Sequence, residues 1–204
     1  MRGTLTRCGS FWTAPPASED ARPTGRLAMT PGGIDGDEAE RSSTKGGTTA
    51  FTVTRVQVGE TLALRQAVLR PHQTLEEVAF PGDDDPSTVA FAAVDAEGGV
   101  LSVARVTLEE APFPIDGVVP VGTPEWRLRG MATRPDARNQ GIGSAVLQTT
   151  IAHVASQGGG LLWCNARVPA TGLYRRAGFT TYGEEWLDPD IGPHIVMWRL
   201  VAAG

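Results

Sequence analysis

The residues with the clearest chemical potential form the run Arg-Asn-Gln-Gly-Ile-Gly-Ser at positions 138–144. Gly141 and Gly143 allow the backbone to turn tightly and to approach a ligand closely. Apolar residues at helical spacing predict a helix over 142–157. The first turn of a helix carries unpaired N–H groups and the positive end of the helix dipole, which favour a phosphate or pyrophosphate, and the Arg138 cation adds a donor. The glycine spacing alone fits a turn without a ligand equally well.

Two better-known glycine motifs are excluded by the same residues. A dinucleotide-binding Gly-x-Gly-x-x-Gly motif would need a third glycine at position 146, where this chain has Val146. A P-loop would need Gly-Lys-Ser or Gly-Lys-Thr, and the only lysine of the chain is the distant Lys45. The run is therefore a candidate anion site of another kind.

The elements that must position this run predict a mixed α/β (α+β) fold. A β-branched alternation predicts a strand at 51–56, and helical spacing predicts a helix at 60–70 that Pro71 ends. The remaining apolar runs and turn residues predict strands at 89–94, 100–107, 126–132 and 161–164, a helix at 170–177, and closing strands at 179–182 and 195–201. The order is hairpins first and then a β-α-β unit.

Two of these segments together resemble a known superfamily. The strand at 128–133, residues 134–137 and the pattern Arg138-x-x-Gly141-x-Gly143 resemble motif A of the GNAT superfamily of acyl-CoA N-acyltransferases. Residues 161–167 and 170–179 resemble its motif B, in which a strand leads into a helix with a tyrosine, here Tyr174, four residues before a Gly-Phe pair. The resemblance is strongest over 128–182, extends by element order over 51–201, and does not include residues 1–50.

The resemblance implies a splayed mixed β-sheet with helices on both faces, with acetyl-CoA as cosubstrate in the split and no metal. By position, backbone groups of Met131, Ala132 and Thr133 would pair with the pantetheine arm. Asn165 and Tyr174 would lie near the thioester. The pyrophosphate would be held by backbone amides of Arg138, Asn139, Gln140, Gly141, Ile142, Gly143 and Ser144.

The implied reaction makes three physical demands. An alkylamine with a pKa near ~10.4 is neutral in only about one molecule in 10³ at pH 7, so a general base or a water chain is useful. The developing oxyanion needs a backbone N–H, for which Met131 is a candidate. The departing thiolate benefits from a proton donor, and in the family the motif-B tyrosine often fills that role. We therefore expect Tyr174 to be the general acid; the alternative is a half-buried aromatic residue on an amphipathic helix.

The general base is less clearly marked. Many relatives have a carboxylate on the strand before the loop, where this chain has Arg127 and Arg129. His194 begins the last predicted strand and is of the residue type that titrates near pH 7, so it is the first candidate. Glu125 is the second. The alternatives are a strand-end histidine with a satisfied hydrogen bond and a solvated strand-end carboxylate.

Other charged and polar residues are open to two interpretations. Arg127 and Arg129 are two positions apart, so they share a face of a strand. Facing the cleft, they would favour an acceptor with a carboxylate; otherwise they are charges on the sheet surface, and the sequence does not decide. We interpret the run Asp83-Asp84-Asp85 as a soluble loop rather than a site for a cationic amine, and Cys164 as inert core.

Composition limits the compartment and the partners. The net charge of −5 and the sequence pI of about 5.2 argue against a general nucleic-acid binder. The apolar runs are far shorter than the ~20 residues that cross a bilayer, so no membrane partner is expected. Cys8 and Cys164 cannot form a disulfide scaffold, which favours a reducing, cytoplasmic location. The scattered histidines and cysteines do not favour a structural zinc site.

The chain divides in composition at residue 50. Residues 1–50 are rich in Gly and Pro and poor in hydrophobic residues, and 31–49 have no period of 2 or 3.6. We expect a disordered tail, or a mis-started one with Met29 as the true start, followed by an acetyltransferase domain at 51–204. No apolar h-region follows Arg2 and Arg7, so a secretory signal is not expected.

The sequence as a whole predicts an N-acetyltransferase that moves an acetyl group from acetyl-CoA to a primary amine of a small molecule, by direct attack in a ternary complex. One alternative is a protein acetyltransferase acting on N-termini or lysines. Another is a non-catalytic acyl-CoA-binding module. Homodimers are common in such folds, so a second copy of the chain is a candidate partner.

Overall fold

The computed structural model describes residues 49–113, 119–120 and 122–204. The tail predicted for residues 1–50 lies outside the described residues except for Thr49 and Ala50. The proline-rich loop before residue 125 is described only in part. The domain predicted to begin at Phe51 opens with a strand at that residue.

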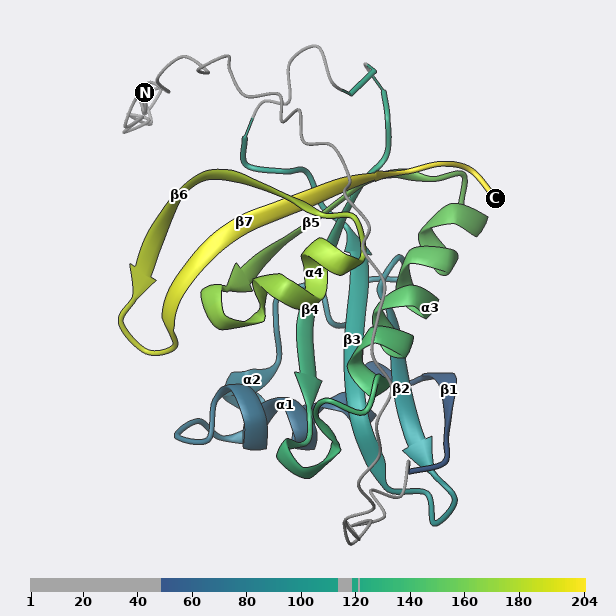
Figure 1. The fold of residues 1–204 in the computed structure, drawn as a ribbon, viewed down its shortest axis with the longest axis vertical. Coiled ribbons are helices and arrows are strands. Elements are labelled where there is room, and N and C mark those ends of the chain that lie inside the picture. Colours follow the sequence, from purple (N-terminus) through teal and green to yellow (C-terminus); the bar gives the residue numbers. More distant parts are fainter. Residues whose placement is uncertain (1–48, 114–118, 121) are drawn as a thin grey trace, which may run out of the picture. The chain divides into compact units, whose positions relative to one another are not determined.

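Seven strands form one mixed sheet in the order β1-β2-β3-β4-β5-β7-β6 (Figure 1). Neighbouring strands are antiparallel except β4 and β5, which are parallel. The strands are β1 Phe51–Val56, β2 Val89–Asp95, β3 Val100–Leu108, β4 Glu125–Thr133, β5 Gly160–Arg167, β6 Thr180–Asp188 and β7 Gly192–Val201. The predicted fold class is confirmed, and every predicted strand is present, although β6 runs six residues beyond the predicted end at residue 182.

Helices cover both faces of the sheet. Leu64 of α1 packs with Ala92, Val103 and Ala132 on one face, whereas α3 packs into the larger core on the other face, which also takes in Tyr174 of α4. Each fully buried aliphatic or aromatic side chain there contributes about 1.5–3 kcal/mol. The helices are α1 Leu62–Leu69, α2 Leu75–Val78, α3 Ile142–Ser156 and α4 Thr171–Arg176. Within the described ranges, no helix is both long and apolar enough to cross a membrane.

Strands β4 and β5 pair only where both begin and then diverge (Figure 1). The paired residues are Glu125–Arg127 and Leu161–Trp163. The junction is tight, because a Cβ at Gly160 would lie 2.2 Å from the Pro124 carbonyl oxygen. That oxygen accepts a hydrogen bond from the Leu161 N–H at 2.9 Å. Beyond the junction, the facing edges of β4 and β5 have no strand partner among the described residues, and they form the two sides of the split that the family resemblance predicts.

A β-bulge in β4 reverses the facing of its side chains. The register against β3 gains one residue on β4 between Arg129 and Ala132, where Gly130 has a φ of +61°. Before the bulge, Leu128 packs on the α3 face; after it, Ala132 packs on the α1 face and Met131 on the α3 face. The bulge therefore points Arg129 and Met131 to different faces of the sheet.

Candidate active site

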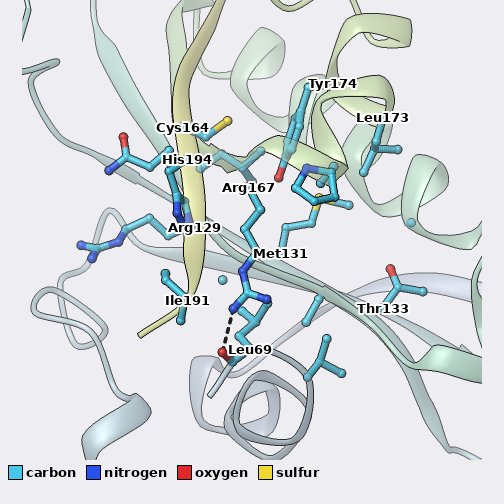
Figure 2. Close-up of a pocket in the computed structure, with 18 of the residues that line it drawn as sticks. Leu69, Arg129, Met131, Thr133, Cys164, Arg167, Leu173, Tyr174, Ile191 and His194 are labelled. Carbon is cyan, nitrogen blue, oxygen red and sulfur yellow. Dashed lines mark hydrogen bonds between the residues drawn. The ribbon is translucent and has the colours of Figure 1, made fainter. Parts of the chain in front are cut away.

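A cavity of about 1030 Å³ occupies the split between β4 and β5, and residues of α4 and of the start of α3 contribute to its lining. Figure 2 shows part of this lining. Most of the predicted site residues line the cavity. These are Met131, Ala132, Thr133, Arg138, Asn139, Gly141, Gly143, Ser144, Asn165, Tyr174 and His194. Three predicted residues do not line it: Glu125, Gln140 and Ile142. The Ile142 side chain is buried in the core, and Gln140 donates a hydrogen bond to the Asp136 carbonyl at 2.9 Å, so these two residues offer the cavity only backbone groups.

The loop at 138–144 holds an unusual backbone conformation. Asn139 and Gly141 both have positive φ values, of 61° and 79°. The loop is braced by the Arg138 side chain, whose Nε donates to the Thr133 carbonyl at 3.2 Å. Gly143 allows the helix to approach β4, because a Cβ there would lie 2.9 Å from Thr133 Oγ1. That oxygen is already hydrogen-bonded to Ser102 Oγ at 2.9 Å, so its position is fixed.

The loop offers a set of unpaired backbone donors. Among the hydrogen bonds between described residues, none is donated by the backbone N–H groups of 139–144, and the first of the helix is that of Ala145 to the Gly141 carbonyl. These donors sit at the positive end of a 15-residue helix, beside the Arg138 guanidinium. The cradle fits the pyrophosphate group that the sequence predicts for it.

The free edge of β4 continues from this loop. Because the pairing with β5 ends at Arg127, the edge of β4 at Met131 to Thr133 that faces β5 has no strand partner among the described residues, although the Thr133 carbonyl accepts the hydrogen bond from Arg138. An extended chain containing amides can add to such an edge as a further strand. The pantetheine arm has two amides of this kind, so this edge fits it as well.

Tyr174 of α4 points its hydroxyl toward the middle of the cavity (Figure 2). Its ring packs edge-on against Phe179, with the centroids 5.5 Å apart, and the residue is only 6% exposed. This burial, with a smaller contribution from Cys164, raises the pKa of the phenol well above its ordinary value. Tyr174 is therefore a neutral phenol over the working pH range, with a proton to donate.

His194 lies in β7 and contributes its ring to the same cavity. Its Nδ1 is 2.7 Å from the Gly192 carbonyl oxygen, which only accepts, so Nδ1–H is the donor. In the neutral imidazole, Nε2 then keeps its lone pair and is the ring's proton acceptor. Trp186 of β6 packs against the ring, with the centroids 5.7 Å apart, which fixes its orientation.

Glu125 is not part of this arrangement. It is the first residue of β4, at the junction with β5, and its Oε2 accepts a hydrogen bond from the Ala111 N–H. The carboxylate is held there by the loop after β3 and does not line the cavity. His194 is therefore the better placed of the two candidates for the base.

Several cavity residues are not among the predicted catalytic and donor-binding residues, and for two of them, Arg127 and Arg129, the sequence leaves open whether they face the cleft. Phe80, Arg127 and Arg129 line the cavity from the α1 face. Arg167, at the end of β5, donates to the Leu69 carbonyl at 2.7 Å and so crosses to the end of α1 (Figure 2). These residues come from segments far apart in the chain, and only the splayed sheet brings them together.

The structure contradicts the expectation for Asp83 and agrees with the expectation for Cys164. Asp83 is not a solvated loop charge, because it bridges Arg65 at 3.1 Å and Arg105 at 2.8 Å. Cys164 reaches the cavity wall, but burial raises the pKa of its thiol, so it stays protonated and is a poor nucleophile. In the described parts of the chain, no group of His, Cys, Asp and Glu side chains is arranged to hold a metal ion.

Comparison with known proteins places the chain in a family. A family model described as the acetyltransferase (GNAT) family matches residues 60–179. A curated relative, the uncharacterized N-acetyltransferase YitI of Bacillus subtilis strain 168, is 31% identical over 147 residues, which cover 72% of this chain and 94% of the relative.

Solved structures share the fold at lower identity. The structure of histone acetyltransferase HPA2 and related acetyltransferase from Corynebacterium glutamicum has a TM-score of 0.57 at 21% identity, covering 76% of this chain and 98% of that one. The ribosomal-protein-S18-alanine N-acetyltransferase of Escherichia coli has a TM-score of 0.57 at 18% identity, with coverages of 76% and 96%. An aminoglycoside 6'-N-acetyltransferase complexed with coenzyme A has a TM-score of 0.56 at 15% identity, with coverages of 74% and 97%.

The fold, the loop before α3 and the matches agree with the motif resemblance. The match to the family model spans both motifs, and the match to the curated relative covers 72% of the chain. The protein belongs to the GNAT family and is an acetyl-CoA-dependent acyltransferase.

Proposed function

We propose that this enzyme acetylates the primary amine of a small molecule, by direct attack of the amine in a ternary complex with acetyl-CoA. The observation that carries the proposal is that one cavity of about 1030 Å³ is lined by the loop at 138–144, Tyr174 and His194. We call the part of this cavity that is lined by Phe80, Arg129 and Arg167 the acceptor end. The Arg167–Leu69 hydrogen bond crosses that acceptor end and favours a small acceptor over a protein chain.

In this proposal the donor is bound mainly by backbone groups. Acetyl-CoA supplies an acetyl group activated as a thioester. The N–H groups of 139–144 hold the pyrophosphate, and the free edge of β4 at Met131 to Thr133 holds the pantetheine arm. Asn165, exposed on β5, faces the same space near the thioester.

The catalytic groups lie around the acyl position. Nε2 of His194 takes the proton from the acceptor amine, directly or through water, so that a neutral amine attacks the acyl carbon. The Met131 N–H, just after the bulge, stabilises the negative charge that develops on the acyl oxygen. As the carbon–sulfur bond breaks, Tyr174 gives its phenolic proton to the departing sulfur. No covalent enzyme intermediate is needed.

Calorimetric titration with acetyl-CoA and with CoA, followed by a thiol-release screen, tests the proposal. The screen compares small primary amines with peptides carrying a free N-terminus or a lysine. Micromolar acetyl-CoA binding and thiol release with small amines are the expected results. Turnover of peptides alone would favour a protein acceptor, and tight binding without turnover of any amine would favour a non-catalytic acyl-CoA-binding module.

A further inference from the structure

Four arginines gather beside the acceptor end of the cavity with two carboxylates. We call Arg65, Arg105, Arg127 and Arg129, with Asp83 and Glu109, the arginine cluster. Asp83 bridges Arg65 and Arg105, and Glu109 pairs with Arg127. Within the described residues, the cluster therefore holds a formal excess of two positive charges in a partly buried place. An excess of this kind is unfavourable unless a further anion offsets it.

Arg129 is the member of the cluster that remains available. Its Nη1 lies 3.9 Å from Glu109 Oε2, too far for a hydrogen bond, and no hydrogen bond between described residues involves its guanidinium. The side chain is 24% exposed, and it lines the cavity. By contrast, Arg65 and Arg105 are almost fully buried in their bridges with Asp83.

Positive charge and burial outweigh the negative charge around Arg129. Burial is the main reason that its pKa falls to about 10, and the like charges of Arg127 and Arg105 add to this effect. Glu109 and Asp83 oppose the shift without cancelling it. A bound anion would restore favourable surroundings for the guanidinium.

The guanidinium is also held in a fixed orientation. It stacks over the Phe80 ring, with Cζ 4.3 Å from the centroid, and Arg65 lies 4.1 Å from the same centroid. Gly130 allows this packing, because a Cβ there would lie 3.1 Å from the Arg65 side chain and 3.3 Å from Phe80. A guanidinium stacked in this way presents a planar fork of donors, which matches the two oxygens of a carboxylate.

The cluster is not positioned for the phosphates of the donor. Arg129 and Thr133 pair with Arg105 and Ser102, which are three residues apart on β3, so their Cα atoms lie roughly 10 Å apart at about 3.3 Å per residue. The pyrophosphate cradle begins beyond Thr133. Arg129 is instead two residues from Met131, where the proposed acyl transfer takes place.

We propose that the acceptor is a small primary amine that carries a carboxylate, as amino acids do, and that Arg129 binds this carboxylate. This assignment rests on the proposed function. Arg127 is committed to Glu109 and to the Trp163 ring at 4.4 Å, so it supports the cluster rather than the acceptor.

The test compares amines that differ only in the carboxylate. Glycine, β-alanine, 4-aminobutyrate and the neutral proteinogenic amino acids are assayed by thiol release beside their carboxamides. Each rate is divided by the fraction of the amine that is unprotonated at the assay pH. The best acid is expected to exceed its amide at least about 10-fold in kcat/KM, as a charge-assisted bidentate contact allows. Arg129→Gln is expected to lower the acid-to-amide ratio of kcat/KM toward one, mainly by raising the KM of the acid. Arg129→Lys is expected to retain part of the preference for the acid.

Controls separate this proposal from the proposed function. Arg55→Gln, on exposed β1, removes an equal charge far from the cavity and should leave the ratio unchanged. Acetyl-CoA affinity and melting temperature verify that the Arg129 variants fold. Acids and amides turned over equally would overturn the carboxylate assignment and leave the acetyltransferase proposal intact. If no small amine is turned over, the binding of the acids to the CoA-loaded protein is measured by titration instead. Equal binding by wild type and Arg129→Gln would then overturn the assignment.

Discussion

The two ends of the cavity are built in different ways. The donor end comes from one continuous stretch, residues 131–144, and offers mostly backbone N–H and C=O groups. The acceptor end is lined by side chains that include Phe80 and Arg129, and Arg65, Asp83 and Arg105 from α1, the 80–83 turn and β3 pack beside them. A backbone site depends on glycine spacing and loop conformation, whereas a side-chain site depends on every contributing residue. The first suits the part of the reaction that a family shares, and the second suits the choice of acceptor.

This difference predicts that substitutions at the two ends of the cavity alter different binding and kinetic constants. Changes at the donor end should alter acetyl-CoA affinity for every acceptor. Changes in the arginine cluster should alter the acceptor KM and leave acetyl-CoA affinity unchanged. Tyr174 and His194, between the two ends, should alter kcat.

The largest effect is expected from Gly141→Glu. A Cβ at Gly141 meets nothing within 4 Å, so the variant can fold, but its φ of +79° is strained for any side chain. The new carboxylate would enter the anion cradle and repel the pyrophosphate. We expect acetyl-CoA affinity to fall about 100-fold or more, since one charge-assisted contact is lost and a repulsion is added. Calorimetry measures the change.

Gly141→Ala is the matched control for this variant. It introduces the same backbone strain, of order 1 kcal/mol, without the charge. Its acetyl-CoA affinity should lie much closer to that of the wild type. Equal affinities for wild type and Gly141→Glu would show that the loop at 138–144 does not hold the donor.

The same contrast explains which parts of the site the sequence predicts. The donor end follows from short-range spacing, because Arg138, Gly141 and Gly143 fix a turn at a helix start within one stretch. The acceptor end follows from contacts between distant segments. Asp83 has the sequence context of a solvated turn, and only the fold shows that Arg65 and Arg105 converge on it. Likewise, nothing local indicates that Glu125 caps the Ala111 N–H.

The fold is predicted well where the elements are long, and less well where they are short. The four-residue helix α2 escapes a periodicity search, although Thr74 and Glu77 form a capping box whose spacing was a usable signal. The length of β6 is missed because most of the strand is exposed and lacks an apolar alternation. The bulge at Gly130 has no signal beyond the glycine itself, yet it decides that Arg129 faces the α1 side of the sheet and Met131 the α3 side.

The next largest effect is expected from Tyr174→Phe. The variant removes the proposed proton donor without changing the packing against Phe179. General acid catalysis contributes on the order of 10²-fold or more, so kcat should fall by about that factor while acetyl-CoA affinity and acceptor KM stay within about twofold. Steady-state kinetics with both substrates varied measures the split. An unchanged kcat would leave Tyr174 a packing residue.

The pH profile gives an independent check on Tyr174. Burial raises the pKa of its phenol, so the folded protein disfavours the phenolate and the donor keeps its proton up to and beyond pH ~10. The wild-type kcat should therefore show no falling limb between about pH 7.5 and 9.5. A decline in that range, absent from Tyr174→Phe, would show that the phenol titrates lower than its burial implies.

A smaller, pH-dependent effect is expected from His194→Gln. The amide keeps much of the side-chain volume and can still donate to the Gly192 carbonyl, but it cannot accept a proton. We expect kcat/KM to fall about 10-fold at pH 7, less than for Tyr174→Phe because water can carry the proton. The deficit should shrink as pH rises toward the amine pKa near ~10.4, since more acceptor is already neutral. A deficit that is constant with pH would indicate a structural role for His194.

The smallest effect concerns stability and shows how the donor end depends on its glycines. A Cβ at Gly143 would lie 2.9 Å from Thr133 Oγ1, which Ser102 holds in place. Gly143→Ala should lose about 1 kcal/mol of folding free energy, because overpacking outweighs the 0.5–1 kcal/mol that alanine gains in a helix, and the melting temperature should fall by roughly 2–4 °C. Thr133→Ala removes the obstructing oxygen, so in the double variant the alanine at 143 should no longer be destabilising, and a thermal double-mutant cycle measures this coupling. Additive effects would mean that helix α3 can move away from β4 at little cost, and that the cradle is less rigid than its glycine spacing implies.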